Sequence, residues 1–178
     1  HPTQGIADLM TIKEKKGRYE GLKICYSGNL YNVAYTTMIF CATLGIDLSI
    51  ACPEGLEPDA DILAETMRRA AISGAKIEFT QDFDAALKDA DVVYGMSQYS
   101  MGQSDEEIAY LKKAFAPYQI TMEAMKKAKP DAIFMHCLPA HRGEEVTDEV
   151  MECDQSVIFD EGENRMHSIK AILAAVAN

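Results

Sequence analysis

Residue types that could do chemistry gather in the nine-residue stretch MHCLPAHRG, at residues 135–143. It places Cys137 directly after His136 and four residues before His141, with a Leu-Pro turn between them. These residue types allow three interpretations: a zinc site, a thiol nucleophile with a histidine base, or a turn that holds a substrate without reacting with it. The elements around the stretch must decide between them.

The zinc interpretation needs more ligands than this stretch supplies. His136 and Cys137 are neighbours at the end of an apolar run, so in a strand their side chains point to opposite faces. Only one of them can share a crevice with His141, whereas structural zinc takes four ligands, and we expect no metal and no cofactor. A nucleophilic thiol would need His141 as its base and also an oxyanion site. The simplest alternative is a buried cysteine that ends a strand.

Short apolar runs alternate with helical patterns along the chain, as is typical of a parallel sheet with crossover helices. The predicted strands are residues 22–28, 47–53, 76–80, 91–96, 131–137 and 156–161. Helices are predicted near 32–44, 59–73, 82–89, 104–114, 121–128, 144–151 and 165–177, after a first amphipathic segment at 6–17. We therefore predict a Rossmann-like three-layer α/β/α fold with a parallel sheet of about five strands.

Ligands of such sheets bind beyond the carboxyl ends of the strands. The stretch SGNLYN at 27–32 follows the first strand but lacks the G-x-G-x-x-G spacing, which argues against a nicotinamide cofactor. Asn29 and Asn32 stand where a helix begins, so one of them is expected to cap that helix; the functional alternative is that Asn32 directs its amide into the crevice. MSQYSMG at 96–102 and CLPAHRG at 137–143 follow later strands and should meet them there.

Length and composition restrict the class of protein. The 178 residues suit one α/β domain with peripheral extensions. A net charge of −11 with dispersed basic residues argues against nucleic-acid binding, and no apolar run approaches the roughly 20 residues of a membrane span. The odd count of five cysteines, three of them in apolar runs, favours reduced thiols in a cytoplasmic protein. Because the chain starts at His1, we expect a cut or processed part of a longer protein.

Three motifs together resemble the ornithine carbamoyltransferases: HPTQGIADLMTI at 1–12, HCLPAHRGEEVTDEV at 136–150 and FDEGENRMHSIKAIL at 159–173. They occur in the family's order, and the first is similar to the link between the family's two domains. The resemblance implies transfer of a carbamoyl group from carbamoyl phosphate to an amine, which gives citrulline and phosphate when the amine is ornithine, in arginine metabolism. Residues 1–178 would then form one amine-binding domain of such an enzyme.

The resemblance also implies roles for particular residues. His1 and Arg165 would donate to the carbamoyl group or to carbamoyl phosphate, where fixed donors stabilise the negative charge of the transition state. Cys137, as thiol or thiolate, would position and deprotonate the attacking amine. Alternatively, Arg165, in a loop entering the last helix, pairs with Glu161 or Glu163 in a solvated cluster. The implied substrate-binding residues are Gln4, Asn32, Met96, Ser100, Met101 and Leu138.

One departure from the family concerns the acceptor. Ornithine enzymes carry an aspartate four residues before a Ser-Met-Gly, and it holds the α-amino group, whereas this chain has Met96 there. A thioether does not pair with an ammonium ion. The loss of a charge-assisted contact of roughly 1.5–3 kcal/mol predicts α-amino recognition weakened by about one to two orders of magnitude. We therefore expect an acceptor other than ornithine, or ornithine held differently.

The other departure concerns the donor. The family's phosphate cradle contains a Ser-x-Arg-Thr-Arg segment in an N-terminal domain, and these 178 residues contain nothing similar. We expect that this carbamoyl-phosphate domain is absent from the chain and that the isolated chain is inactive. The resemblance implies a homotrimer for a full-length protein. The alternative, from another class, is a non-catalytic small-amine-binding or interaction module derived from the same fold.

Overall fold

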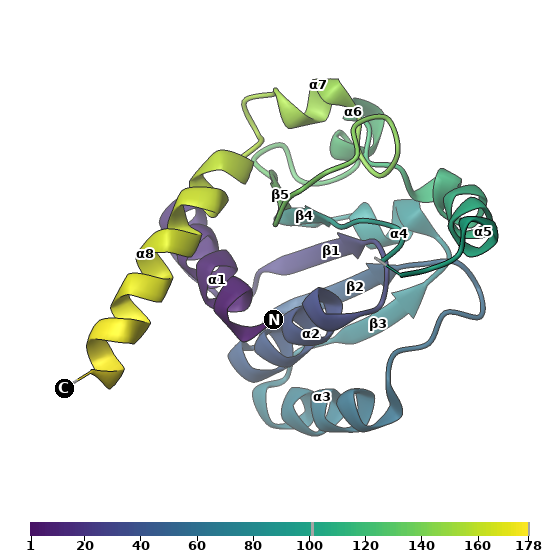
Figure 1. Cartoon of the computed structure of the whole chain (residues 1–178). Coiled ribbons are helices and arrows are strands. Elements are labelled where there is room, and N and C mark those ends of the chain that lie inside the picture. The colour runs from purple at the N-terminus through teal and green to yellow at the C-terminus, as the bar shows by residue number, and fades with distance from the viewer. Residues whose placement is uncertain (101, 178) are drawn as a thin grey trace.

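The computed structural model describes residues 1–100 and 102–177 and contains a five-stranded parallel sheet (Figure 1). The strands are β1 (Lys23–Ser27), β2 (Asp47–Ala51), β3 (Ile77–Thr80), β4 (Val92–Gly95) and β5 (Ile133–His136). Their order is β3-β2-β1-β4-β5, and each neighbouring pair is parallel. The predicted fold class is confirmed.

The helices begin and end at residues suited to those places. Asp59 caps one by accepting hydrogen bonds from two backbone amides, and Ser104 forms a capping box with Glu107 at another. No described helix is both long and apolar enough to cross a membrane. The helices are α1 (Pro2–Lys16), α2 (Asn32–Leu44), α3 (Ala60–Ser73), α4 (Phe83–Leu87), α5 (Asp105–Phe115), the 3-10 turn η1 (Ala116–Tyr118), α6 (Met122–Met125), α7 (Asp148–Met151) and α8 (Ile158–Val176).

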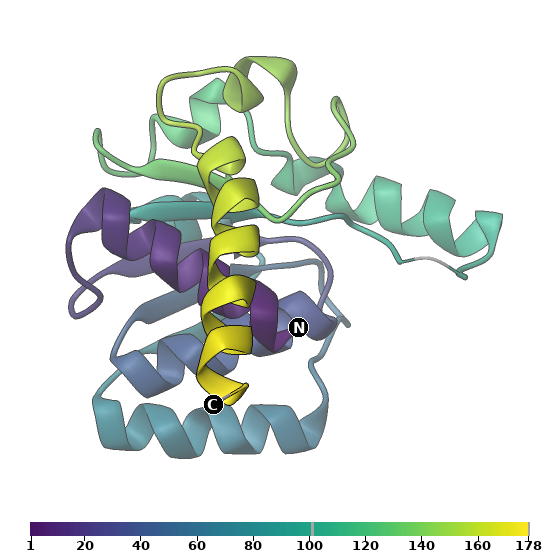
Figure 2. The same cartoon turned by 60° about the vertical axis from the view of Figure 1, so that its left-hand side comes forward.

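The handedness of crossovers distributes these helices over two faces of the sheet. The chain moves in one direction from β1 through α2 and α3 to β3, then returns through α4 to β4, and right-handed connections put these two sets on opposite faces. Accordingly α2 packs against α3 and α1, and α1 packs along α8, whereas α4 contacts the strands and α6 (Figures 1 and 2). Strands β4 and β5 are buried throughout and β1 and β2 almost throughout, as expected for strands covered on both faces, whereas the edge strand β3 is partly exposed.

The predicted strand at 156–161 is wrong, because α8 begins at Ile158. Ser156 forms an isolated parallel bridge with Phe134 of β5, and the chain then turns into the helix. The buried residues of α8 follow a helical spacing, while Phe159 is exposed. The last helix is therefore longer than predicted, and it includes Arg165, which was expected in a loop.

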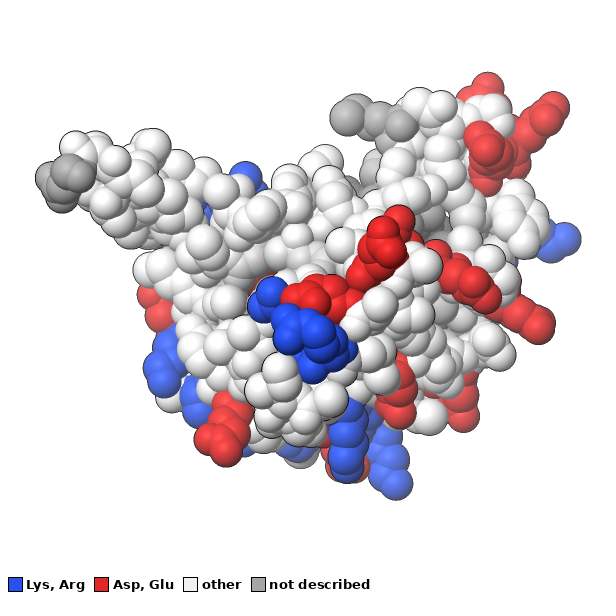
Figure 3. Space-filling view, turned by 90° about the horizontal axis from the view of Figure 1, so that it is seen from below, with Lys and Arg blue, Asp and Glu red and all other residues white. Residues whose placement is uncertain are grey.

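The C-terminal end of α8 projects from the rest of the molecule (Figure 1). Figure 3 shows this end as an arm almost without charged side chains, whereas acidic and basic groups lie close to one another on the body beside it. The buried residues of the helix are all within its first eleven residues, from Ile158 to Ser168. The first part of α8 therefore belongs to the domain core, and the last part does not.

Candidate functional site

A cavity of about 540 Å³ lies beyond the carboxyl ends of β1, β4 and β5. Strand order reverses between β1 and β4, and ligands of open parallel sheets bind where the connections diverge in this way. Most of the candidate site residues from the sequence analysis line this cavity. Those that line it are His1, Asn32, Met96, Ser100, Cys137 and Leu138. Met101 lies outside the described residues.

Gln4 and Arg165 are not among the residues that line this cavity. They meet instead between α1 and α8, where Arg165 Nη1 donates a hydrogen bond to Gln4 Oε1 at 2.6 Å. Gln4 Nε2 donates to Asp8 Oδ1 at 2.7 Å and lies 3.3 Å from Glu161 Oε1. The alternative in which Arg165 joins a solvated cluster on its own helix is therefore wrong, because this contact runs to a buried side chain of α1.

Asp8 and Glu161 form a buried carboxyl pair that the sequence analysis missed. Tyr94 lies against both, with its hydroxyl 3.3 Å from Asp8 Oδ2 and 3.4 Å from Glu161 Oε1. Burial raises the pKa of Asp8 to about 6. Burial and the neighbouring Asp8 carboxylate hold the pKa of Glu161 well above its ordinary value. The pair therefore keeps its protons to higher pH than solvated carboxyl groups would, and the acidic side chain on the apolar face of α1 was the available signal.

The turn after β5 is held from inside the protein by His136. The ring is fully buried, which confirms that it faces the core, and Nδ1 accepts a hydrogen bond from Leu138 N at 2.9 Å. Its proton is therefore on Nε2, which faces Glu145 Oε1 at 3.3 Å. Glu161 Oε2 accepts from His136 N at 2.9 Å and ties α8 to the same turn. These bonds leave Cys137 at the cavity wall.

Cys137 is half-buried beside Met96, with its Sγ 3.4 Å from Met96 Sδ. Burial raises the pKa of Cys137 to about 12, so at neutral pH the group is a thiol and not a thiolate. His141, the candidate base, packs its ring against Tyr99 at 5.2 Å and faces Glu145 Oε1 at 3.5 Å. The described contacts thus include no bond from His141 to the thiol, and they do not support a nucleophilic cysteine.

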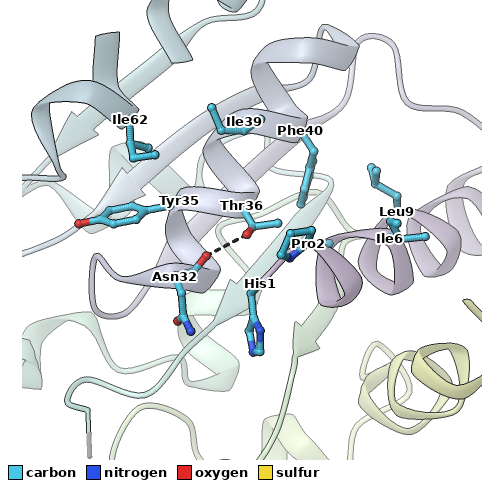
Figure 4. A pocket seen from close by; sticks show the side chains of 11 residues that line it. His1, Pro2, Ile6, Leu9, Asn32, Tyr35, Thr36, Ile39, Phe40 and Ile62 are labelled. Carbon is cyan, nitrogen blue, oxygen red and sulfur yellow. Dashed lines mark hydrogen bonds between the residues drawn. The ribbon is translucent and has the colours of Figure 1, made fainter. Parts of the chain in front are cut away.

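The start of α2 supplies the amide on the opposite wall. Tyr31, and not an asparagine, occupies the N-cap position, so the prediction that one of Asn29 and Asn32 is the N-cap residue is wrong, although Asn32 still binds an amide of the first turn. Asn32 Oδ1 accepts a hydrogen bond from Val33 N at 2.9 Å. Figure 4 shows the Asn32 and His1 side chains close together and pointing to the same side, away from an apolar groove between α1 and α2. Both residues line the cavity at the strand ends.

A parallel α/β domain with a ligand-sized cavity at the strand reversal is a small-molecule-binding domain of Rossmann-like fold. Residues 20–176 match the family model described as aspartate/ornithine carbamoyltransferase, Asp/Orn binding domain. The chain therefore belongs to the aspartate/ornithine carbamoyltransferase family.

Relatives agree with this assignment. The ornithine carbamoyltransferase of Thermococcus kodakarensis is 51% identical over 99% of the chain and 56% of its own length, and that of Bacillus subtilis is 48% identical over 99% and 55%. The solved ornithine carbamoyltransferase of Pyrococcus furiosus superposes with a TM-score of 0.92 at 49% identity, covering 98% of this chain and 55% of that one. An N-acetyl-L-ornithine transcarbamylase superposes with a TM-score of 0.89 at 28% identity, covering 99% of this chain and 56% of that one. The chain thus spans little more than half the length of these relatives.

Proposed function

We propose that this chain is the acceptor-binding half of a carbamoyltransferase that acts on the primary amine of ornithine or of a related amine. The observation that carries the proposal is the cavity, because it gathers Cys137 and Leu138 from one strand end, Met96 from the next and Asn32 from a third. The names of the relatives support the reaction, since those with 48 to 51% identity are ornithine carbamoyltransferases. Carbamoyl phosphate is the proposed donor.

The reaction is a displacement at the carbamoyl carbon. The neutral amine nitrogen attacks that carbon, an N–C bond forms, and the C–O bond to phosphate breaks, so that phosphate leaves with the bonding electrons and takes up the proton that the nitrogen loses. Cys137, as a thiol, orients the amine through weak hydrogen bonds and does not act as an anionic base. His1, at the same cavity, offers an N–H to the carbonyl oxygen as it becomes negative.

Arg165 is the proposed donor toward carbamoyl phosphate. Its Nη1 is held by Gln4, while its Nε is buried without a hydrogen-bond partner in the described part of the chain. A buried donor without a partner is costly, and a guanidinium offers a planar fork for phosphate or carbonyl oxygens. In this arrangement Gln4 is a positioning residue that fixes the guanidinium.

A fusion protein tests the proposal. The N-terminal domain of the Pyrococcus furiosus relative is joined ahead of His1, and formation of the ureido product is measured with carbamoyl phosphate and a panel of amines. We expect turnover by the fusion and none above background by the chain alone. Arg165→Gln should lower kcat by about a hundredfold or more, as loss of a transition-state donor does. Arg68→Gln, on the exposed face of α3, is the matched control and should change nothing.

Two results would contradict the proposal. Ordinary rates of product formation by the chain alone would show that no second half is needed. A folded fusion that binds amines but makes no ureido product would favour the non-catalytic amine-binding module. By the same family resemblance, we propose a homotrimer for the full-length protein, which sedimentation of that protein would check. The free state of all five cysteines in the described structure supports a cytoplasmic setting.

A further inference from the structure

The side chains that line the acceptor cavity are mostly uncharged, apart from the two histidines His1 and His141. None of the described residues that line it is an aspartate, glutamate, lysine or arginine. Proteins hold an ammonium group mainly with carboxylates, and a charge moved out of water without a partner is costly. A ligand that brought a second ammonium ion into this cavity would therefore lose hydration and gain no ion pair.

Glu144 and Glu145 follow the cavity residue His141 closely in the sequence, and both take part in contacts within the protein. Glu144 accepts a hydrogen bond from Tyr99 at 3.1 Å and pairs with Lys112 at 2.7 Å. Glu145 is only 3% exposed and accepts from His141 N at 2.6 Å. Tyr99 and His141, the partners of these acids in the two hydrogen bonds, do line the cavity. Glu145 Oε2 is buried without a hydrogen-bond partner in the described part of the chain, and neither acid is among the described residues that line the cavity.

Met96 lies beside Cys137 at the cavity wall. Its Sδ lies 3.4 Å from Cys137 Sγ, and its backbone N donates to Ser27 O at 2.9 Å. Gly28 packs so closely that an added Cβ would lie 2.6 Å from the Met96 Cβ. The thioether is therefore fixed at the wall, and it is apolar and only a weak acceptor. The positive end of α2, which begins at Asn32, also disfavours a cation there.

We propose that the acceptor is a primary amine with no second ammonium group near the reacting nitrogen, its far end being uncharged or anionic. Two kinds of compound meet this description: ω-amino acids without an α-ammonium, and diamino acids whose α-nitrogen is acylated. The inference rests on the proposed function and specifies the substrate class of the same cavity.

Binding to the 178-residue chain tests the inference without need of the donor. NMR titrations near pH 7 compare L-ornithine with 5-aminopentanoate, which has the same carbon chain, amine and carboxylate but lacks the α-ammonium, and with Nα-acetyl-L-ornithine. We expect one or both of the latter to bind at least about tenfold more tightly than ornithine, with shifts at Met96 and Cys137. Met96→Asp should improve ornithine binding by about ten- to a hundredfold, as gain of a charge-assisted contact does.

Two variants are the controls for charge and for shape. Met96→Leu keeps an apolar side chain and should keep the wild-type preference. Met67→Asp adds the same charge on the exposed face of α3 and should leave all affinities unchanged. If Met96→Asp does not fold, the relative affinities of the wild-type chain for the three amines still test the inference. Ornithine binding as tightly as the other two overturns the inference but leaves the amine site standing. No shift at cavity residues with any amine overturns the proposed function itself.

Discussion

The Cys137 thiol is less acidic than a free cysteine because it is buried at the cavity wall. Burial raises its pKa from about 9 to about 12. Thiolate is the form that reacts with iodoacetamide, so alkylation near pH 8 should be roughly a thousandfold slower than for an ordinary thiol. Mass spectrometry of the Cys137 peptide gives the rate. The matched control is a synthetic peptide of residues 135–143, and a ratio below about tenfold would contradict the prediction.

The placement of a side chain could be predicted from the sequence where the local backbone alone determines it. The strand alternation placed His136 and Cys137 on opposite faces, and the structure confirms that His136 is buried and that Cys137 lines the cavity. The pairing of Gln4 with Arg165 was not predictable, because it depends on how α1 packs along α8, more than 150 residues apart in the chain. The local sequence pattern of each helix does not show how the two helices align along one another.

At the scale of elements, Gly28 lets the ends of β1 and β4 approach. Its φ of 154° suits glycine, and an added Cβ would lie 2.6 Å from both the Cβ and the carbonyl oxygen of Met96. We expect Gly28→Ala to lower the free energy of unfolding by roughly 3 kcal/mol and to displace Met96 from the cavity. Chemical denaturation measures the first effect and amine titration the second.

Gly162, in α8, is the matched control for that change. An added Cβ there has no heavy atom within 4 Å, and alanine is the better helix former. Gly162→Ala should therefore raise the free energy of unfolding by about 0.5–1 kcal/mol. If both alanine variants shift stability equally, close packing at Gly28 is not what limits that position.

The pair of Asp8 and Glu161 joins α1, α8 and β5, and it makes stability depend on pH. An acid with a raised pKa in the folded state binds its proton more tightly there than in the unfolded chain. The stabilisation is fully present below the unfolded value of 3.8 and is lost as pH rises through the folded value of about 6. This shift corresponds to roughly 3 kcal/mol at about 1.4 kcal/mol per pKa unit.

We therefore expect Asp8→Asn to remove part of the decline in stability between pH 4 and pH 7. The difference in unfolding free energy between wild type and variant should change by roughly 3 kcal/mol across that range, in favour of the variant at the higher pH. Denaturation at several pH values measures it. Asp154→Asn, at an exposed turn, is the control and should leave the profile unchanged.

Helices and strands could be predicted where an apolar or helical pattern was long or was bounded by capping or turn residues. All five strands of the sheet were predicted, together with helices capped by Asp59 and Ser104. The run SVIFDE failed because a short apolar run does not distinguish a buried helix from a strand. The spacing of Ile158, Glu161 and Asn164 on one face carried the helical signal, but it became evident only over the longer segment.

At the scale of the whole molecule, the two halves of α8 contribute unequally to the domain. Buried side chains end at Ser168, whereas Leu173 is 60% exposed and Val176 is 73% exposed. A chain that ends at Lys170 should therefore unfold with a free energy within about 1 kcal/mol of the full chain, because the described positions that it lacks are exposed, apart from the half-buried Ile172, and exposed positions contribute little. A chain that ends at Val157 loses Ile158 and the partners of α1, so it should fail to fold cooperatively.

Hydrogen exchange distinguishes the two halves without truncation. Amides of residues 172–177 should exchange rapidly, while those of 161–168 should be protected to nearly the global stability, because the buried residues of α8 end at Ser168. Uniform protection along α8 would contradict this division, as would a loss of more than about 2 kcal/mol on truncation at Lys170. The division matters for the site, since Glu161 and Arg165, which reach β5 and Gln4, both lie in the packed half.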